Sequence, residues 1–183
     1  MAVDVGKVFE AELEHVFRLL DDQYLMAWHR FPDTHSAGGR GIQPQPSDYL
    51  LGLPPGASVP SSQRGVNVNR SVFFEAKASE KHRTMQKSAV RAEQRGFIHR
   101  YAGLLHLPYL VCHYSTLTGN IQMWDGRAVS EAGAGKRLVA KHLLIEFAAG
   151  TGRKLNKEKC ACAFQEFFSL PDKLKTVKLY NQF

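Results

Sequence analysis

The sequence contains few cysteines and no long apolar run. The three cysteines, Cys112, Cys160 and Cys162, are too few for a disulfide framework in 183 residues, so we expect a reducing, intracellular, cytoplasmic setting. Cys160 and Cys162 are separated by one residue and have no second cysteine pair, which predicts no zinc site. No apolar run approaches the roughly 20 residues that span a bilayer, so we expect no membrane partner.

Two further signals are missing. The first predicted helix carries charges throughout, unlike a signal peptide. The glycines of segment 133–137 do not form a phosphate-binding P-loop, because Ser130 stands at the first glycine position and Arg137 replaces the final Ser or Thr. The sequence therefore indicates neither secretion nor a P-loop nucleotide site.

Basic residues exceed acidic ones. Lys and Arg number 24 against 17 Asp and Glu, the formal net charge is +7, and the isoelectric point is about 9.4. This balance favours a polyanionic partner, of which nucleic acid is the commonest. The apolar content of 44% is ordinary for a globular protein, and the length suits one domain over 1–183, with two small units left open.

The chain begins with apolar residues at helical spacing and continues with short apolar runs that are typical of strands. Asp4 can cap a helix that ends near Leu20, and the segment 24–31 is typical of a first strand. Short strands are predicted to end near Gly52 and to cover 72–77. Between them, the segment 53–69 is rich in Pro, Gly and Ser, and we expect a mobile excursion there.

The second half is predicted in less detail. A helix is expected over about 84–105, with Leu104 and Leu105 on its buried side, and a buried strand over 109–114 that pairs with 121–124. The segment 138–147 fits a helix or a strand. The extension 126–183 either completes the fold at the edge of the sheet or holds a dimer surface.

Two strand segments bring carboxylates and an amine together. Glu75 and Lys77 are two residues apart and project from the same face of a strand, and Asp48 lies on a predicted neighbouring strand. Two close carboxylates repel each other unless a cation lies between them, and Mg²⁺ suits such oxygen ligands. Alternatively, Glu75 and Lys77 form an exposed salt bridge, and Asp48 is a turn residue.

An ordered set of motifs resembles a known family. The segments 6–10, 47–49 and 74–77, followed by Gln94, are similar to the pattern of the PD-(D/E)xK nucleases. Within that superfamily they resemble the Holliday junction resolvases of the archaeal and RecU types. The resemblance covers roughly 4–115. The chain departs from the archaeal type by carrying Ala11, where arginine usually follows the helix glutamate.

The resemblance implies a fold and a set of catalytic roles. The fold is α/β, with a central mixed β-sheet flanked by helices and a restriction-endonuclease-like core over about 4–125. Glu10, Asp48 and Glu75 would hold Mg²⁺, for which Mn²⁺ can substitute. Lys77 would orient the attacking water, and Gln94 would position the water or the phosphate. Without the resemblance, Glu10 is a surface glutamate and Gln94 an ordinary surface amide.

Six basic residues are candidates for contacts with the DNA backbone. One precedes the Asp48 strand in a Gly-rich segment, two follow the Glu75 strand, and three are spaced by four, which would align them on one helix face. The alternative is a solvated helix face. These residues are Arg40, Lys81, Arg83, Lys87, Arg91 and Arg95.

The expected function is metal-dependent, structure-selective cleavage of four-way DNA junctions by paired symmetric nicks. The two-fold relation between the nicked strands leads us to expect a homodimer. One alternative is another nuclease of the superfamily, of restriction or exonuclease type. The other is a non-catalytic DNA-binding module in which the carboxylates are salt-bridged.

Overall fold

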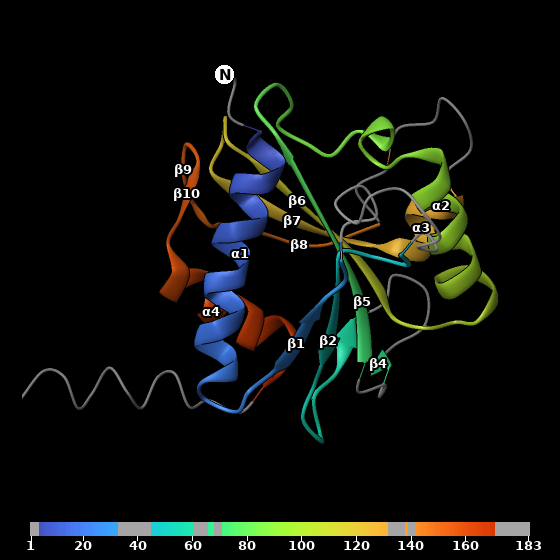
Figure 1. The fold of residues 1–183 in the computed structure, drawn as a ribbon, viewed down its shortest axis with the longest axis horizontal. Helices are drawn as coiled ribbons and strands as arrows, with labels where there is room; N and C mark the ends of the chain where they lie inside the picture. The colour runs from blue at the N-terminus through green and yellow to red at the C-terminus, as the bar shows by residue number, and fades with distance from the viewer. Residues whose placement is uncertain are drawn as a thin grey trace, which may run out of the picture.

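A mixed β-sheet forms the centre of the molecule. The computed structural model describes residues 4–32, 45–60, 66–67, 71–131, 138 and 142–170. Six of the described strands form one sheet, in the order β1-β2-β5-β6-β7-β8 (Figure 1). Only the β5–β6 pair is parallel, and the other neighbours in this sheet are antiparallel. The strands are β1 (Ala27–Arg30), β2 (Tyr49–Gly52), β5 (Ser71–Ser79), β6 (Tyr109–Ser115), β7 (Asn120–Asp125) and β8 (Leu143–Ala148).

Helices cover both faces of this sheet. The helices α1 (Val5–Asp21) and α4 (Lys157–Phe167) pack together on one face, and the shorter helical elements lie on the other (Figure 1). The predicted α/β class with a mixed sheet is confirmed. No helix within the described ranges has the length and apolar character that a membrane crossing requires. The shorter elements are η1 (Lys87–Ala89), α2 (Ala92–Ile98), the π-helical η2 (His99–Leu104) and α3 (Gly126–Glu131).

Two small hairpins complete the described chain. One pairs β3 (Val59–Pro60) with β4 (Val66–Asn67), inside the segment 53–69 that was predicted to be an excursion. The rest of that segment lies partly outside the described residues. The other hairpin pairs β9 (Gly150–Thr151) with β10 (Lys154–Leu155).

The first helix follows the predicted pattern closely. The Asp4 side chain accepts a hydrogen bond from the Gly6 N–H at 2.9 Å and so caps the helix. The apolar positions spaced by three and four are buried against the sheet. These buried residues are Phe9, Leu13, Val16, Phe17 and Leu20.

Aromatic rings fill the core between the sheet and α1. The Phe17 ring lies 5.4 Å from that of Tyr49, 5.5 Å from that of Phe74 and 6.0 Å from those of Trp28 and Phe164. Edge-to-face and tilted arrangements of this kind add to the stabilisation from apolar burial. Phe17 therefore links the N-terminal helix, strands β1, β2 and β5, and the C-terminal helix.

The described part of the C-terminal extension completes the fold. Segment 138–147, which the sequence left open, contains the first residues of β8 at one edge of the sheet. Cys160, Phe164 and Phe168 of the α4 region are buried in the same core as α1, and Cys112 is buried with them, as predicted. The apolar residues of α4 are thus used within this chain and give no indication of a dimer surface.

The first strand is shorter than the sequence predicted. β1 covers only Ala27–Arg30, because the chain turns before it. Tyr24 has a positive φ of 57° and is 87% exposed, so it belongs to the turn and not to the sheet.

The predicted helix over 84–105 is wrong in its continuity. Gln86, Val90 and Arg91 have extended backbones. The fully buried Val90 side chain packs with Ile98 and Trp124 in a second core cluster, on the face of the sheet away from α1, and so fixes this break in the helix. The chain then passes from α2 into a π-helical segment, whose wider turn changes which positions face inward. Leu104 and Leu105, expected to be buried, are 64% and 55% exposed.

Truncation of Phe17 should strongly destabilise the fold. We expect Phe17→Ala to lower the free energy of unfolding by about 3–5 kcal/mol, because it opens a cavity among four aromatic rings. The matched control is Leu117→Ala, whose side chain is 57% exposed in the β6–β7 turn and should change stability by less than about 0.5 kcal/mol. Urea unfolding followed by circular dichroism measures both, and similar losses in the two variants would contradict this account of the core.

Candidate functional site

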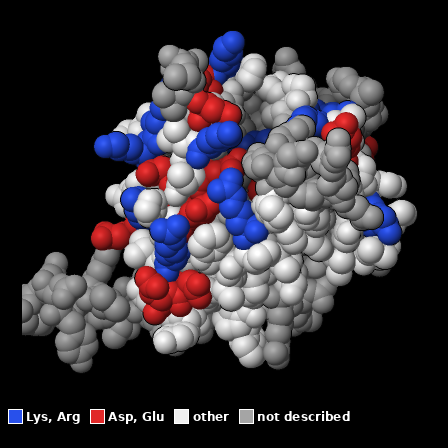
Figure 2. All heavy atoms as spheres, viewed as in Figure 1, with Lys and Arg blue, Asp and Glu red and all other residues white. Residues whose placement is uncertain are grey.

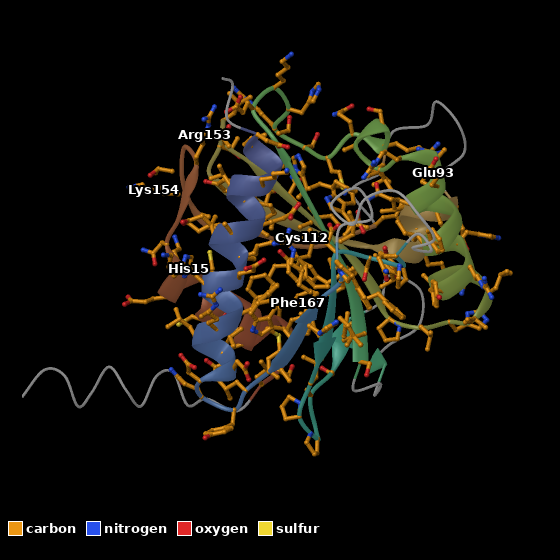
Figure 3. All side chains as sticks on the ribbon, in the orientation of Figure 1. His15, Glu93, Cys112, Arg153, Lys154 and Phe167 are labelled. Carbon is orange, nitrogen blue, oxygen red and sulfur yellow. The ribbon has the colours of Figure 1, made fainter. Side chains whose placement is uncertain are left out.

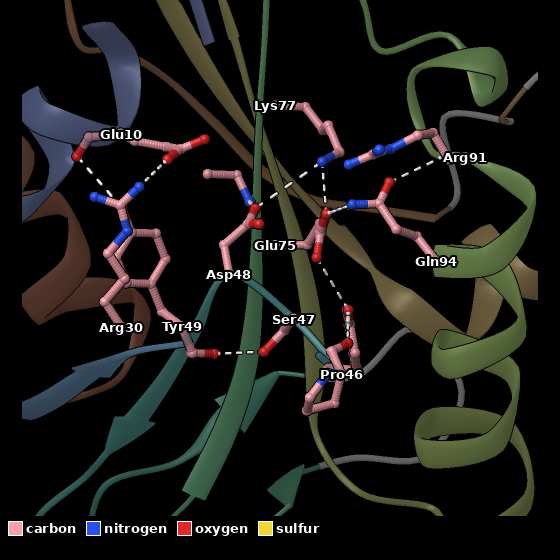
Figure 4. Close-up of polar contacts among 12 residues, drawn as sticks. Glu10, Arg30, Pro46, Ser47, Asp48, Tyr49, Glu75, Lys77, Arg91 and Gln94 are labelled. Carbon is pink, nitrogen blue, oxygen red and sulfur yellow. Dashed lines mark hydrogen bonds and ion pairs between the residues drawn. The ribbon is translucent and has the colours of Figure 1, made fainter. Parts of the chain in front are cut away.

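The Lys77 ammonium lies between two carboxylates. Its Nζ is 2.5 Å from Glu75 Oε1 and 3.9 Å from Asp48 Oδ2 (Figure 4). Glu75 and Lys77 are adjacent because residues two apart on β5 project from one face, as the sequence predicted. The Glu75 side chain is only 1% exposed, so an exposed salt bridge is the wrong interpretation of this pair.

Pairing of β2 with β5 brings Asp48 to the site. Asp48 directly precedes β2, one position beyond the paired residues Tyr49 and Phe74. Its Oδ2 accepts a hydrogen bond from the Ala76 N–H at 2.8 Å, on the strand that carries the other two charges. Asp48 thus lies at a bend directly before the strand, not within the strand as predicted, and its carboxylate is fixed across the sheet.

Two neutral side chains hold the Glu75 carboxylate. Gln94 Nε2 donates a short hydrogen bond to Oε1, and the Tyr109 hydroxyl lies 3.3 Å from Oε2. Tyr109 also donates to the Pro46 carbonyl oxygen at 2.6 Å, which links the segment before Asp48 to β6. Because the hydroxyl has a single hydrogen, the short bond to Pro46 leaves only a weak, shared contact with Glu75 Oε2, whereas Oε1 accepts from both Lys77 and Gln94.

The start of α2 positions Gln94. Its Oε1 accepts from the Arg91 N–H at 3.1 Å, which orients the amide so that its Nε2 points to Glu75. In Figure 4 the Arg91 side chain extends from this helix end in the direction of Lys77. Gln94 is consequently part of the site and not an ordinary surface amide.

Crowding and burial alter the protonation of the carboxylates. Burial, followed by the negative charge of Asp48, raises the pKa of Glu75 to about 7, although the Lys77 ammonium and the hydrogen bonds from Lys77 and Tyr109 act in the opposite direction. Burial and Asp48 also raise the pKa of Glu10 above its usual range. The site therefore favours an additional positive charge, either a proton or a cation.

Glu10 lies beside this cluster but has a different partner. Arg30 donates from Nη2 to Glu10 Oε2 and from Nη1 to Glu14 Oε1, both at 2.7 Å (Figure 4). The Tyr49 hydroxyl lies 3.4 Å from Glu14 Oε1. The structure thus brings Asp48, Glu75, Lys77 and Gln94 together and places Glu10 at the margin, within an ion pair.

The predicted basic residues are only partly gathered. Lys81 and Arg83 are exposed beyond the end of β5, and Arg40 lies outside the described residues. The prediction that Lys87, Arg91 and Arg95 share one helix face is wrong, because the extended residues near Val90 interrupt the helix. Arg95 instead donates to the Val90 carbonyl oxygen at 2.5 Å.

The surface around the site mixes both signs of charge. Figure 2 shows Lys and Arg side chains among Asp and Glu side chains over the part of this face near α1, whereas other residue types cover much of the rest. Side chains of opposite charge are thus interspersed over this part of the surface.

The donor set fits a magnesium ion held by two carboxylates. In the described part of the chain, no group of three or more His, Cys, Asp or Glu side chains is close enough to surround one metal ion. Mg²⁺ in phosphoryl-transfer sites typically uses one or two carboxylates, with water and substrate phosphate completing its shell. Asp48 and Glu75 already converge on one cation, the Lys77 ammonium, so their geometry suits a shared positive charge.

Sequence reasoning missed two residues of the site. Tyr109 was counted only as a member of a buried strand, although a buried tyrosine hydroxyl usually needs a polar partner. Arg30 was not singled out, although Glu10 and Glu14 are four apart on one helix and therefore present two carboxylates to the same neighbour. Both contacts join segments that are distant in sequence.

A buried polar row continues from Lys77 across the sheet. Lys77 pairs in register with His113, and His113 pairs with Gln122. His113 is 1% exposed, and burial lowers its pKa to about 4, so it is neutral near pH 7. Among the described residues, its Nδ1 and the Ser115 Oγ have no hydrogen-bond partner.

The raised pKa of Glu75 predicts how stability depends on pH. The unfolded chain has the lower pKa, near 4.5, so the stabilisation from Glu75 is complete below that pH and is lost as pH rises through about 7. Without divalent ions, we expect the unfolding free energy of the wild type minus that of Glu75→Gln to fall between pH 5 and 8. The change should be on the order of 1–3 kcal/mol.

Comparison of the two proteins isolates Glu75 from other titrating groups. His113 has a lowered pKa and therefore contributes with the opposite sign, but it is present in both proteins. Urea unfolding at a series of pH values in EDTA provides the data. If the unfolding free energy of the wild type minus that of Glu75→Gln stays constant or grows with pH, the assigned environment of Glu75 is contradicted.

Comparisons with known proteins give no family assignment. No model of a known protein family matches the chain, and no curated protein is significantly similar to it in sequence. A function is therefore inferred from the geometry of the Asp48–Glu75–Lys77 cluster and from the motif resemblance.

Proposed function

We propose that this chain is a Mg²⁺-dependent endodeoxyribonuclease of the PD-(D/E)xK type that resolves four-way DNA junctions. The observation that carries the proposal is the convergence of the Asp48 and Glu75 carboxylates on the Lys77 ammonium, with Gln94 bonded to Glu75. This arrangement joins the motif segments that resemble the nuclease family. A restriction-endonuclease-like core is accordingly part of the proposal.

The chemistry requires positive charge at the reacting phosphate. Hydrolysis of a phosphodiester adds negative charge to a group that is already anionic, so the catalyst must stabilise the developing charge. A bound Mg²⁺, or Mn²⁺ in its place, would polarise the phosphate oxygens and lower the pKa of water at the site. Asp48 and Glu75 are the residues that would hold the ion.

Each side chain of the cluster has a distinct part in the proposal. Lys77 orients the attacking water or neutralises an oxygen of the phosphate with its compact charge. Gln94 fixes the Glu75 carboxylate and would position the water or the phosphate. Tyr109 fixes the same carboxylate from the other side. Glu10, held by Arg30, contributes negative charge from the margin of the site.

The substrate class depends on charge and on the family resemblance. A net charge of +7 supports a DNA partner, and backbone contacts of basic side chains give affinity without sequence specificity. The choice of a four-way junction comes from the resemblance to the Holliday junction resolvases. Two symmetric nicks require two active sites related by a two-fold axis, so we propose a homodimer, acting in the cytoplasm.

One observation favours a second candidate, a DNA-binding module without catalysis. Lys77 already pairs with both carboxylates, and a proton on Glu75, whose pKa is raised to about 7, would balance the remaining charge without a metal. In that case the cluster would serve to fix β2 against β5. A third candidate, another nuclease of the same superfamily, shares the mechanism but cuts linear DNA.

Cleavage of synthetic DNA separates the three candidates. An immobile four-way junction and a linear duplex of the same sequence are incubated with and without Mg²⁺. We expect symmetric nicks in the junction alone that require Mg²⁺ and fall below detection in Asp48→Asn, with DNA binding retained. Asp21→Asn, an exposed aspartate at the end of α1, is the matched control and should cut like the wild type.

The other outcomes distinguish the alternatives. Equal cutting of junction and duplex would remove junction selectivity and leave the nuclease. Binding without cutting across several divalent ions would favour the non-catalytic module and refute the mechanism.

Loss of the Gln94 amide should slow cleavage without weakening binding. We expect Gln94→Ala to reduce the single-turnover cleavage rate by about 10–100-fold, a typical effect of removing a group that orients a metal ligand. Gln86→Ala is the control, because its amide donates to the nearby Thr84 carbonyl oxygen and does not bond to Glu75. Equal rates for the two variants would show that Gln94 has no part in the reaction.

A further inference from the structure

A charged hairpin lies next to the end of the strand that carries the candidate site. Arg153 and Lys154 are in the β9–β10 hairpin, at the outer edge of the molecule, and both are exposed (Figure 3). Its strands have only two residues each, and an isolated hairpin of that size is at most marginally stable. Contacts with the rest of the fold must therefore hold it in place.

Three contacts of different kinds anchor this hairpin. The Tyr114 hydroxyl donates to the Gly152 carbonyl oxygen at 2.9 Å, and the Leu155 N–H donates to Glu12 Oε2 at 3.0 Å. Arg153 Nε donates to Glu80 Oε1 at 2.7 Å. The hairpin thus presents its cationic side chains from a position fixed by β6, by α1 and by the residue that follows β5.

The ion pair with Glu80 sets the position of Arg153 relative to the candidate site. Glu80 follows β5 directly and is three residues beyond Lys77, which corresponds to about 10 Å along the strand. Lys81 is the next residue, and its N–H donates to Ser79 Oγ at 3.1 Å, which fixes the turn. We call Glu80, Lys81, Arg153 and Lys154 the hairpin surface.

The separation of about 10 Å along the chain between Lys77 and Glu80 is compatible with contacts to one duplex arm. A duplex rises about 3.4 Å per base pair along each strand, so 10 Å corresponds to about three base pairs. A duplex arm with its scissile phosphate at Lys77 could therefore place phosphates about three base pairs away near Arg153. With three cations and one carboxylate, the hairpin surface has a net charge of +2.

We propose that the hairpin surface binds the sugar–phosphate backbone of the duplex arm next to the cleaved phosphate. This inference rests on the proposed nuclease function and assigns to it a DNA contact outside the Asp48–Glu75–Lys77 cluster. The planar Arg153 guanidinium can pair with a phosphate group. When DNA binds, this phosphate replaces Glu80 as the partner of Arg153. Glu80 therefore positions Arg153 before binding and opposes the phosphate electrostatically.

Salt-dependent binding tests the proposal without requiring catalysis. Binding of a fluorescent junction is measured by anisotropy over a range of salt concentrations, in EDTA so that no strand is cut. Removing one ionic interaction with a phosphate reduces the slope of log affinity against log salt by about 0.9. We expect Arg153→Gln to reduce this slope by about one and to weaken binding.

Two further variants make the test specific. Glu80→Gln removes the competing carboxylate and should strengthen binding. Arg127→Gln is the matched control, because Arg127 is also a partly exposed arginine paired with a glutamate, Glu131, but it lies in α3 and is not part of the hairpin surface. It should bind like the wild type. Lys154→Gln should reduce the slope as Arg153→Gln does, and it disturbs no ion pair found among the described residues.

The outcomes separate this inference from the proposed function. If the wild type binds DNA but Arg153→Gln and Lys154→Gln keep the slope and affinity of Arg127→Gln, the hairpin surface does not bind DNA, and the nuclease proposal stands. Weaker binding by Glu80→Gln would also overturn it. Absence of DNA binding by the wild type at low salt would overturn both. Thermal unfolding of each variant confirms that it is folded.

Discussion

The buried Glu75 carboxylate is the constraint on which the arrangement of the site depends. An ionised carboxylate that is 1% exposed is costly unless a cation and hydrogen-bond donors surround it. Lys77 supplies the cation from the same strand, and Gln94 and Tyr109 supply donors from α2 and β6. Asp48 joins them through the Ala76 N–H, so the register of β2 against β5 is tied to the same cluster.

This cluster is a poor means of stabilising a fold. Replacing a buried ion pair by apolar residues of similar volume is often neutral or stabilising, so a buried pair is weak evidence for a structural role. The core already has a strong source of stability in the aromatic rings around Phe17, on the other face of the sheet. The fold therefore separates the packing of α1 and α4 from the charges on the α2 side, which agrees with a functional role for Asp48, Glu75 and Lys77.

Local patterns predicted the elements that depend on local physics. The capped helix from Asp4 and the buried strand predicted over 109–114, which is found over Tyr109–Ser115, follow from spacing and composition, and the period of two in a strand correctly placed Glu75 beside Lys77. The mixed sheet was expected from the resemblance to a family, and the structure confirms that the sheet is mixed.

Contacts between distant segments explain what the sequence did not show. The helix predicted over 84–105 is interrupted because Val90 is buried in the second core cluster, and helical spacing alone cannot show that. Arg30 and Tyr109 contact the site because β1 and β6 pair within the same sheet, and these pairings are not visible in the sequence. The assignment of β8 to an edge strand likewise depends on pairing with β7.

Direct measurement of divalent-ion binding tests the central claim, that Asp48 and Glu75 share one cation. Calorimetric titration with Mg²⁺ and Mn²⁺ is done on the wild type, Asp48→Asn and Lys77→Met. We expect binding to the wild type, loss of binding in Asp48→Asn, and tighter binding to Lys77→Met, because the ammonium no longer competes for the two carboxylates. Absence of binding in both the wild type and Lys77→Met, or unchanged binding in Asp48→Asn, would contradict this claim.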